Sequence, residues 1–508
     1  MPQPYYITTA IAYPNGRPHI GHAYEAVATD AIARFQRLMG RDVRLITGTD
    51  EHGLKMAQTA RNAGRETLEF ADEMSSYFKD MCEKLHINYD KFMRTTNARH
   101  HAASVALWKA MEASGDLYLD RYEGWYSIRD EAYYADDEVT GGEGEQKLSP
   151  QGTPVEWTVE ESWFFRLSKY QDQLLAHYRD NPEFIRPDSR KNEVLRFVEG
   201  GLRDLSVSRT SFDWGVPVPG SPGHVMYVWV DALTTYLSGL GFPDPNSDYS
   251  KFWPANVHII GKDIVRFHAV YWPAFLMSAG LPLPKQVFGH GFILARDGAK
   301  MGKSAGNAAD PMELADRYGV DQFRYFLLRE VSFGQDGSWS EEAIVARSNS
   351  ELTNGLGNLA QRCLSMIYKN FDGILPLGMA DMGPEVDALG AHLNAQQAME
   401  TLDISRATEH LRIGVDLANK YFADRAPWTD PHSPRAQDAL YRTAEAIRRL
   451  AIAHRWLIPT SCDLILDQLA VPKDESYRNF SAILSHQLQP GGKINEPIGI
   501  FPRLKVEN

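Results

Sequence analysis

The first fifty residues show two kinds of hydrophobic pattern in succession. Residues 5–13 are rich in β-branched and aromatic side chains, which is typical of a buried strand. After turn-forming residues at 14–18, apolar residues recur at three- and four-residue steps from 19 to 39 and predict a helix that Gly40 ends. Residues 41–47 predict a second strand. Strand, helix and strand in this order predict a βαβ unit with a parallel sheet, and hence a Rossmann-like fold.

The rest of the chain divides into regions of different pattern. Residues 116–225 are rich in Tyr, Trp, Gly, Pro and acidic residues, which predicts an inserted connective domain. Apolar runs at 225–229 and 257–261 resume the alternation of strand and helix, and helical periodicity extends from about 345 to near 485. We therefore expect an α/β Rossmann-like domain with an insertion, followed by an all-α bundle. The predicted regions are 1–115, 116–225, 226–290, 291–345 and 346–508.

Composition and charge narrow the class of protein. Of 508 residues, 43% are hydrophobic and 23% charged, and no apolar run reaches the ~18 residues of a membrane helix. The N-terminus has no basic region or cleavage site of a secretory signal, and three distant cysteines give no disulfide framework, so we expect a cytoplasmic chain. The net charge of −13 argues against nonspecific polyanion binding by the whole surface, but local Lys and Arg can still bind a nucleic acid.

His19 and His22 lie where the predicted helix follows the first strand. Backbone N–H groups and the positive end of the dipole stabilise phosphates at such a helix start. Histidines three residues apart share one face and add donors, while Gly21 leaves room for a flat ring to approach the backbone. Two capping or surface histidines fit the motif equally well when it is taken alone.

Lys300 and Lys303 occur in a loop framed by Gly298, Gly302 and Gly306. Two ammonium groups in such a loop can close over a triphosphate and stabilise the charge that builds on departing pyrophosphate. Taken alone, this motif is better explained as a solvated basic loop. Together with the histidine pair, which lies on the same predicted sheet, it favours a nucleoside triphosphate site.

The two motifs resemble the signatures of class I aminoacyl-tRNA synthetases, His-Ile-Gly-His and Lys-Met-Ser-Lys-Ser. The chain resembles the methionyl-tRNA synthetases over essentially its whole length. Further segments that resemble this family, in the family's order, are 10–16, 47–53, 227–232, 261–264, 267–268, 290–292 and 358–362. The resemblance implies a methionine–tRNA ligase, which activates L-methionine with ATP, releases pyrophosphate and transfers the methionyl group to the 3′ end of tRNA(Met). Gly302 replaces the usual serine, and we expect activity to persist because the lysines provide the charge.

The resemblance also implies roles for individual residues. Those for ATP are Gly16, His19, Gly21, His22, Lys300, Lys303 and Ser304, the two histidines and two lysines being the catalytic ones. Those around methionine are Ala10, Ile11, Tyr13, Asp50, Val228, Trp229, Leu233, Tyr236, Ile264, Phe267 and His268. A thioether is apolar and a weak acceptor, which suits this mixture of aromatic walls and polar tips, and Asp50 matches the carboxylate that binds the substrate ammonium. Spacing alone favours core packing for Trp229 and Tyr236 and a cap or turn for Asp50.

For tRNA binding, the resemblance implies that Asn358 and Arg362 recognise the anticodon. Unstacked bases are bound by edge hydrogen bonds and by stacking, for which these side chains are suited. An ordinary solvated pair four residues apart on a helix fits them as well. Phe480 is a candidate stacking platform for an anticodon base. Contact with the tRNA backbone, or a solvated helix face, fits Arg442, Arg448, Arg449 and Arg455.

The sequence also gives expectations for bound metals and for the oligomeric state. Many relatives have zinc knuckles in the connective domain, but residues 125–130 run through the first expected knuckle without a cysteine, and no cysteine lies between 83 and 362. We therefore expect no structural zinc and no metal held by protein ligands. Mg²⁺ is expected with ATP, bridging its phosphates. Some relatives continue into a C-terminal dimerisation module, for which this sequence leaves no room, so we expect a monomer.

Other functions fit the sequence less well than a methionine–tRNA ligase. A synthetase for leucine, isoleucine or valine needs a large editing domain, and an insertion of about 110 residues is too short for it. A cysteine enzyme would have a cysteine-rich zinc site. A noncatalytic RNA-binding paralogue has no need of His19, His22, Asp50, Lys300 and Lys303. A small-molecule nucleotidyltransferase of the same superfamily would not need the helical C-terminal region.

Overall fold

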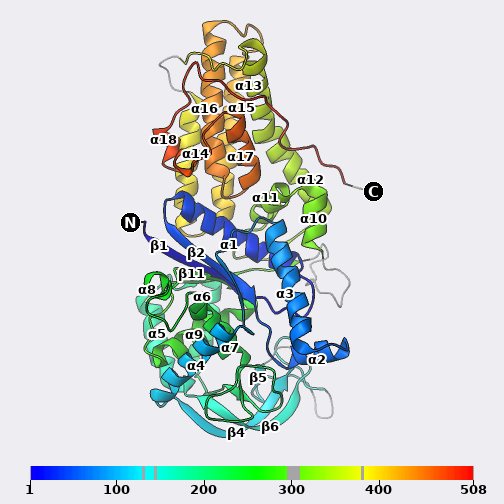
Figure 1. Ribbon diagram of the computed structural model, residues 1–508, viewed down its shortest axis with the longest axis vertical. Coiled ribbons are helices and arrows are strands. Elements are labelled where there is room, and N and C mark those ends of the chain that lie inside the picture. The colour runs from blue at the N-terminus through cyan, green and yellow to red at the C-terminus, as the bar shows by residue number, and fades with distance from the viewer. Residues whose placement is uncertain (1, 129–131, 142–145, 295–308, 379–382, 507–508) are drawn as a thin grey trace.

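A six-stranded parallel sheet lies near the middle of the molecule, below the helical bundle (Figure 1). The computed structural model describes residues 2–128, 132–141, 146–294, 309–378 and 383–506. The strands, in the order β3-β2-β1-β11-β12-β7, are β3 (Lys91–Arg94), β2 (Asp42–Thr49), β1 (Pro4–Thr9), β11 (Val257–Gly261), β12 (Val287–His290) and β7 (Ile185–Arg186). The order reverses between β1 and β11, and ligands bind such sheets in the crevice at the carboxyl ends of the two strands.

The strand β1 is buried on both faces of the sheet because helices cover both. Successive side chains of a strand point to opposite faces. Tyr5 and Ile7 therefore pack in the core that includes α1 (Ile20–Leu38), whereas Tyr6 packs in the core that includes α7 (Val228–Ser238) and α9 (Trp272–Ser278). The predicted strand, helix and strand at the N-terminus are confirmed as β1, α1 and β2.

The strand expected at 225–229 is wrong for most of its length. Only Val225–Met226 form a strand, β10, which pairs antiparallel with β9 (Ser208–Arg209) outside the main sheet. Tyr227 is extended, and α7 begins at Val228. A short apolar run cannot distinguish a strand from a buried helix by periodicity, and here the helix is buried almost all round.

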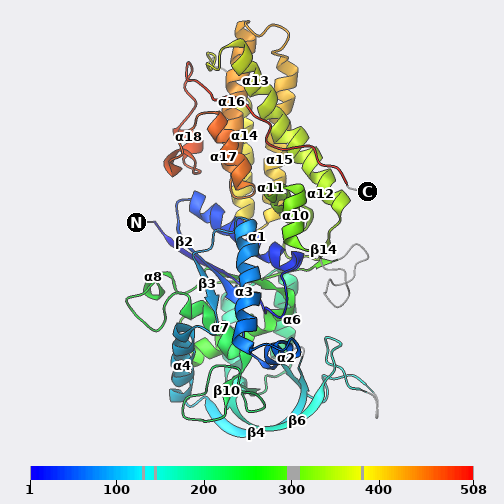
Figure 2. The same cartoon turned by 45° about the vertical axis from the view of Figure 1, so that its right-hand side comes forward.

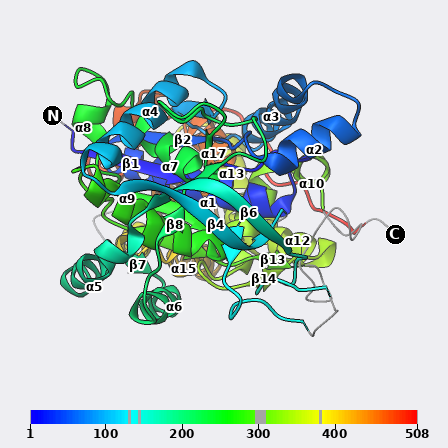
Figure 3. The same cartoon turned by 90° about the horizontal axis from the view of Figure 1, so that it is seen from below.

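A strongly curved antiparallel sheet forms the lower end of the molecule (Figure 3). Its strands, in the order β5-β4-β6-β8, are β5 (Ala132–Tyr134), β4 (Leu117–Ser127), β6 (Glu156–Phe165) and β8 (Leu205–Ser206). The connective segment expected at 116–225 contains this sheet, but it also contributes β7, which pairs parallel with β12 in the main sheet. This two-residue strand is too short to produce a hydrophobic pattern in the sequence.

Helices make up the upper half of the molecule, as predicted (Figure 2). A rod of α12 (Glu341–Arg347), η5 (Ser348–Gly357) and α13 (Asn358–Asn370) leads from the sheet region into the bundle. It is kinked at Gly355, whose backbone is not helical, and η5 has the wider turns of a π-helix. The bundle is completed by α14 (Pro384–Glu400), α15 (Ile404–Arg425), α16 (Pro434–His454), α17 (Pro459–Gln468) and α18 (Ala482–Ser485). Residues 490–506 contain no helix, as the Gly and Pro content predicts.

The remaining elements connect these parts. The helices are α2 (Leu54–Asn62), α3 (Thr67–Lys84), α4 (Ala98–Ala113), α5 (Gln171–Asp180), α6 (Asp188–Glu199), α8 (Tyr249–Phe252), α10 (Pro311–Tyr318) and α11 (Val320–Glu330), with 3-10 turns at Leu167–Tyr170, Lys262–Ile264 and Glu475–Tyr477 and a π-turn at Phe267–Tyr271. The strands β13 (Ile293–Leu294) and β14 (Gly337–Ser338) pair parallel. One apolar core is continuous from α1 through α11 into the bundle, so the two halves pack as one body.

Candidate functional site

The two histidines of the first motif cap α1. Nδ1 of His19 accepts a hydrogen bond from the backbone N–H of Gly21 at 3.1 Å, and Nδ1 of His22 accepts one from the backbone N–H of His19 at 3.1 Å. Because both Nδ1 atoms accept, each neutral ring has its proton on Nε2. The rings lie 3.9 Å apart, centroid to centroid, beside the positive end of the helix dipole. The capping alternative is therefore correct for Nδ1, and in each neutral ring the N–H group is on Nε2.

Gly21 makes this arrangement possible. A Cβ atom at position 21 would lie 2.9 Å from Cε1 of His19, closer than side chains tolerate. Gly21 therefore makes room for the ring of His19.

His19 and His22 line a cleft of about 910 Å³ at the carboxyl ends of β1 and β11. All the residues predicted for methionine line this one cleft: Ala10, Ile11, Tyr13, Asp50, Val228, Trp229, Leu233, Tyr236, Ile264, Phe267 and His268. So do Gly16, His19, Gly21 and His22, which were predicted for ATP. The cleft is large enough for an amino acid and a nucleotide together, since ligand sites typically measure about 300–1,000 Å³.

One wall of the cleft is aromatic. The rings of Trp229 and Phe267 stack at 3.8 Å with an interplanar angle of 5°. The edge of the Trp229 ring meets His268, at 5.9 Å between centroids. These residues come from α7 and from the π-turn before α9, so the wall is built by two elements far apart in the sequence.

A polar pair lies behind this wall. The hydroxyl of Tyr236 is 2.7 Å from Nε2 of His268, and Nδ1 of the same ring is 2.9 Å from the carbonyl oxygen of Ile264. A carbonyl only accepts, so Nδ1 bears the proton and Nε2 accepts from the tyrosine. Burial lowers the pKa of His268 to about 4, which keeps the ring neutral near pH 7. The backbone of Tyr236 is fixed in turn by a hydrogen bond from the Tyr6 hydroxyl to its carbonyl.

Asp50 follows β2 directly and is 8% exposed. Its backbone N–H donates to the carbonyl of Ala12 at 2.8 Å, and this bond holds the end of β2 against the residues that follow β1. The hydroxyl of Tyr13 accepts from the backbone N–H of Met56 at the start of α2. Asp50 therefore lines the cleft with its backbone fixed at the end of β2, and it is not a helix cap, since the N-cap of α2 is Gly53.

A second polar pair in the cleft went unpredicted. Nε2 of His290 donates to Oε2 of Glu25 at 2.8 Å, and its Nδ1 is 2.8 Å from the carbonyl oxygen of Gly291. Although burial lowers it, the pKa of His290 is raised overall because Glu25 favours the charged ring. A sequence signal existed for one partner, since Glu25 lies three residues after His22 on the helix face that bears the motif.

The second motif lies outside the described residues. Lys300, Lys303, Ser304 and Gly302 fall in the range 295–308. The described chain reaches this range from β13, next to cleft residues 290–293, and resumes at Ala309, whose carbonyl accepts from the backbone N–H of Ile20 in α1. Both ends of the segment are therefore close to the elements that form the cleft.

The residues predicted for the anticodon lie far from the cleft, on α13 in the upper half of the molecule (Figure 2). Asn358 begins this helix, and Arg362 is exposed one turn later. The guanidinium of Arg362 lies 4.8 Å from the ring centre of Trp428, which is 47% exposed just after α15. Trp428 was not predicted, because a single tryptophan in a loop has no periodic pattern. Its ring is a flat apolar surface beside a planar cation.

Phe480, a candidate stacking platform, and the four arginines, for which contact with tRNA or a solvated helix face was open, lie in other environments. Phe480 is buried, with its ring against Phe35 and His392. Arg448 and Arg449 are buried in ion pairs with Glu445 at 2.7 and 2.9 Å. The two other arginines are likewise paired with acidic side chains, Arg442 with Asp438 and Glu385, and Arg455 with Asp463 and Glu475. Because these arginines are buried and paired, their charges stabilise contacts inside the bundle.

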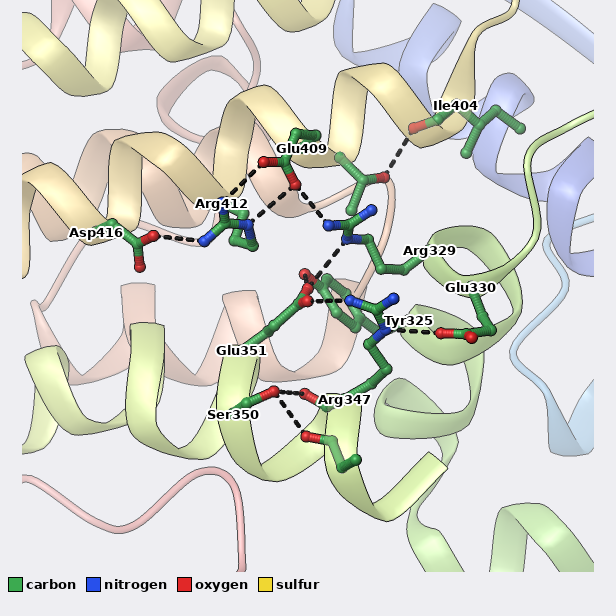
Figure 4. Close-up of polar contacts among 12 residues, drawn as sticks. Tyr325, Arg329, Glu330, Arg347, Ser350, Glu351, Ile404, Glu409, Arg412 and Asp416 are labelled. Carbon is green, nitrogen blue, oxygen red and sulfur yellow. Dashed lines mark hydrogen bonds and ion pairs between the residues drawn. The ribbon is translucent and has the colours of Figure 1, made fainter. Parts of the chain in front are cut away.

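A network of ion pairs joins the rod to its neighbours (Figure 4). Glu351 on η5 accepts hydrogen bonds from Tyr325 at 2.7 Å, Arg329 at 3.1 Å and Arg347 at 2.6 Å. Arg329 also donates to Glu409 on α15. The network thus fastens the rod between α11 and α15, seven residues before Asn358.

Within the described ranges, no group of three or more His, Cys, Asp or Glu side chains is arranged to hold a metal ion. Cys82, Cys363 and Cys462 are buried free thiols. Across the same ranges, no helix has the length and apolarity to span a membrane.

Comparison with known proteins gives close matches over the whole chain. The family described as tRNA synthetases class I (M) matches residues 5–364, and the anticodon binding domain of methionyl tRNA ligase matches residues 379–508. The methionine–tRNA ligases of Brucella suis and Mycobacterium bovis are 55% and 53% identical, over 98% and 99% of this chain and 98% of each relative. The solved Mycobacterium tuberculosis methionyl-tRNA synthetase in complex with methionyl-adenylate is 52% identical, with a TM-score of 0.94 over 99% of this chain and 100% of that one. The apo form of that enzyme superposes with a TM-score of 0.89.

Proposed function

Because this chain belongs to the methionyl-tRNA synthetases of class I, the methionine–tRNA ligases, we propose that its cleft binds methionine and ATP side by side and joins them as methionyl-adenylate. One observation supports this most strongly: the aromatic wall, the carboxylate of Asp50 and the start of α1 line a single cleft. The similar Mycobacterium tuberculosis enzyme has been solved with methionyl-adenylate bound.

The methionine side chain enters between the aromatic wall and the residues after β1. Trp229 and Phe267 provide the flat apolar surface that an unbranched thioether can cover. The neutral ring of His268 and the hydroxyl of Tyr236 form a polar tip without a net charge, which suits the weakly accepting sulfur. Asp50 binds the substrate ammonium through a charge-assisted hydrogen bond. The remaining contacts are those of Ala10, Ile11, Tyr13, Val228, Leu233 and Ile264.

ATP lies with its phosphates at the start of α1. Nε2 of His19 and of His22 donates to the phosphates, where the helix dipole also favours negative charge. The methionine carboxylate attacks the α-phosphorus, the new phosphorus–oxygen bond forms as the bond to the β-phosphate oxygen breaks, and pyrophosphate leaves with that electron pair. Lys300 and Lys303 stabilise the leaving group, and Gly16, Gly21 and Ser304 complete the site. ATP enters as its Mg²⁺ complex, with the ion on the phosphates.

The tRNA is bound at two places that lie far apart, the cleft and α13. Its terminal hydroxyl attacks the carbonyl carbon of the adenylate in the cleft and displaces AMP. On α13, Asn358 and Arg362 contact anticodon bases, and Trp428 offers a ring on which one base stacks. The match to the anticodon binding domain of methionyl tRNA ligase supports this arrangement.

We place the enzyme in the cytoplasm as a monomer. Its buried thiols match the reducing conditions of that compartment. Analytical ultracentrifugation of the full chain gives a single species of about 57 kDa if this is correct, since the chain has a mass of 57.3 kDa.

Asp50→Asn tests the binding of methionine. The amide is the same size but lacks the charge that pairs with the ammonium, so KM for methionine in ATP–pyrophosphate exchange rises about 100-fold, as expected for a charged hydrogen bond of about 3 kcal/mol, while KM for ATP stays within twofold. Asp72→Asn, at an exposed aspartate that pairs with Arg94 outside the cleft, is the matched control. An unchanged KM for methionine in Asp50→Asn would contradict the proposed role.

A further inference from the structure

Asp231 is a buried carboxylate on α7 that the proposed chemistry does not use. Its side chain is 1% exposed, and it accepts from Nδ1 of His52 at 2.5 Å and from Nε2 of His100 at 2.6 Å. Although burial raises it, the pKa of Asp231 is lowered overall by the two histidines. A carboxylate in the interior is stabilised only by such pairing.

The carboxylate lies on the back of the helix that forms the methionine wall. At about 100° per residue, Trp229, Leu233 and Tyr236 share one face of α7, which lines the cleft. Asp231 and Ser238, seven residues apart, share the opposite face. His100 on α4 contacts both, since its Nδ1 is 2.9 Å from the Ser238 hydroxyl.

The other histidine belongs to the loop that bears Asp50. This loop is held at successive positions: the backbone N–H of Glu51 donates to the Thr95 hydroxyl, and the Trp214 ring donates to the Glu51 carbonyl. The backbone N–H of Gly53 donates to the Trp214 carbonyl. A loop tied in this way moves as a unit, so a shift at His52 also moves Asp50, two residues earlier.

We infer that Asp231 is a positioning residue for methionine: through His52 it sets the distance between Asp50 and the aromatic wall of α7. The ammonium of methionine and its thioether are joined by a short chain, so both contacts form only when the carboxylate and the wall are correctly spaced. This inference rests on the proposed roles of Asp50 and Trp229. Neither Asp231 nor His52 lines the cleft.

Three variants of the full chain test the inference by ATP–pyrophosphate exchange. Asp231→Asn places an amide N–H against one histidine N–H, and His52→Leu removes the donor. Each raises KM for methionine at least 10-fold and leaves KM for ATP within twofold. His52→Asn restores an N–H near the position of Nδ1 and returns KM for methionine to within threefold of the original value.

The controls separate positioning from folding. Thr234→Ala changes an equally buried residue of α7 whose hydroxyl donates to its own helix, and it leaves both KM values unchanged. In the double variant of His52→Leu and Asp231→Asn, KM for methionine is no higher than in the worse single variant, because one connection is lost in both. If Asp231→Asn does not fold, the comparison of His52→Leu with His52→Asn decides the question alone.

Two results would overturn the inference. One is an equal rise of KM for methionine and ATP in His52→Leu, or only a lower melting temperature, which means that the pair merely stabilises the fold. The other is a KM for methionine in His52→Asn as high as in His52→Leu. Asp50→Asn separates this inference from the proposed function: if it raises KM for methionine while the His52 variants do not, only the positioning role is wrong, and if it has no effect, the assigned ammonium site is wrong.

Discussion

Tyr236 donates its hydroxyl to Nε2 of His268 over 2.7 Å, and this bond defines the state of the imidazole in the cleft. The other ring nitrogen donates to the Ile264 carbonyl, so one proton on the ring satisfies both contacts. A neutral ring avoids leaving a charge beside an uncharged thioether. Burial supports this state by lowering the pKa of His268 to about 4.

The neutral state of His268 predicts how methionine binding depends on pH. Because the pKa of this ring is about 4, its protonation does not change between pH 6 and 8. KM for methionine, measured by ATP–pyrophosphate exchange, therefore has no step near pH 6.5 that is due to His268. Any step at that pH in the original chain also occurs in His268→Gln. A step at that pH in the original chain alone would mean that the ring titrates like an exposed histidine.

The same pKa predicts a loss of stability in acid. Between pH 6.5 and 4 the unfolded chain binds a proton at His268 that the folded chain excludes, so the free energy of unfolding falls as the pH falls through this window and is fully restored above 6.5. The slope from this residue is at most about 1.4 kcal/mol for each pH unit. Urea unfolding in steps of pH measures it, and His268→Gln reduces the slope. Equal slopes in the two chains would contradict the assigned shift.

His19→Asn separates capping from catalysis. The Asn carbonyl can still accept from the Gly21 N–H, as Nδ1 of His19 does, but nothing replaces the Nε2 donor. We expect kcat of ATP–pyrophosphate exchange to fall about 100-fold, the effect of losing one donor to transition-state charge. The melting temperature stays unchanged, whereas His19→Ala lowers it because the cap, about 1 kcal/mol, is lost too. A large loss of stability with normal kcat in His19→Asn would assign the ring to structure alone.

Trp428→Ala tests the stacking platform at the anticodon. Loss of base stacking costs about 1–3 kcal/mol, so kcat/KM for charging of tRNA(Met) falls about 5- to 150-fold while exchange, which needs no tRNA, is spared. Asn358→Ala and Arg362→Ala give the same separation of the two activities. Leu417→Ala, exposed to a similar degree on α15, leaves both activities intact. Equal losses in exchange and charging would refute the anticodon role of the three residues.

Glu351→Gln tests the network in Figure 4. Burial raises the pKa of Glu351, but the hydrogen bonds from Tyr325 and Arg347 lower it overall, so the carboxylate is charged and its loss leaves two arginines poorly paired. We expect the free energy of unfolding, measured with urea, to fall by about 2–4 kcal/mol. Asp416→Asn, at the 59% exposed end of the same network, costs less than about 1 kcal/mol. Equal small effects would mean that the network contributes little.

Sequence patterns predicted the parts of this molecule in which local chemistry decides structure. The N-terminal strand, helix and strand follow from apolar periodicity, and the need for glycine at position 21 follows from the histidine beside it. The prediction of a strand at 225–229 was wrong for most of its length, because a short apolar run fits a buried helix equally well. The strand β7 was not predicted, because two residues contain no pattern.

The environment of the charged residues was not predicted, for a different reason. Arg448 and Arg449 were expected to contact tRNA or to lie on a solvated helix face, although Glu445 lies three and four residues before them, a spacing that predicts ion pairs on a helix. The partner of His52 could not be predicted, because Asp231 lies 179 residues away and only the fold brings them together. Contacts of this kind depend on topology.

ATP–pyrophosphate exchange with each of the twenty amino acids measures directly whether the cleft selects methionine. With the full chain, methionine is expected to give the highest kcat/KM, because the flat wall of Trp229 and Phe267 and the neutral polar pair behind it match an unbranched thioether. Exchange with leucine or cysteine above that with methionine would contradict this account. Absence of exchange with all twenty would contradict catalysis itself.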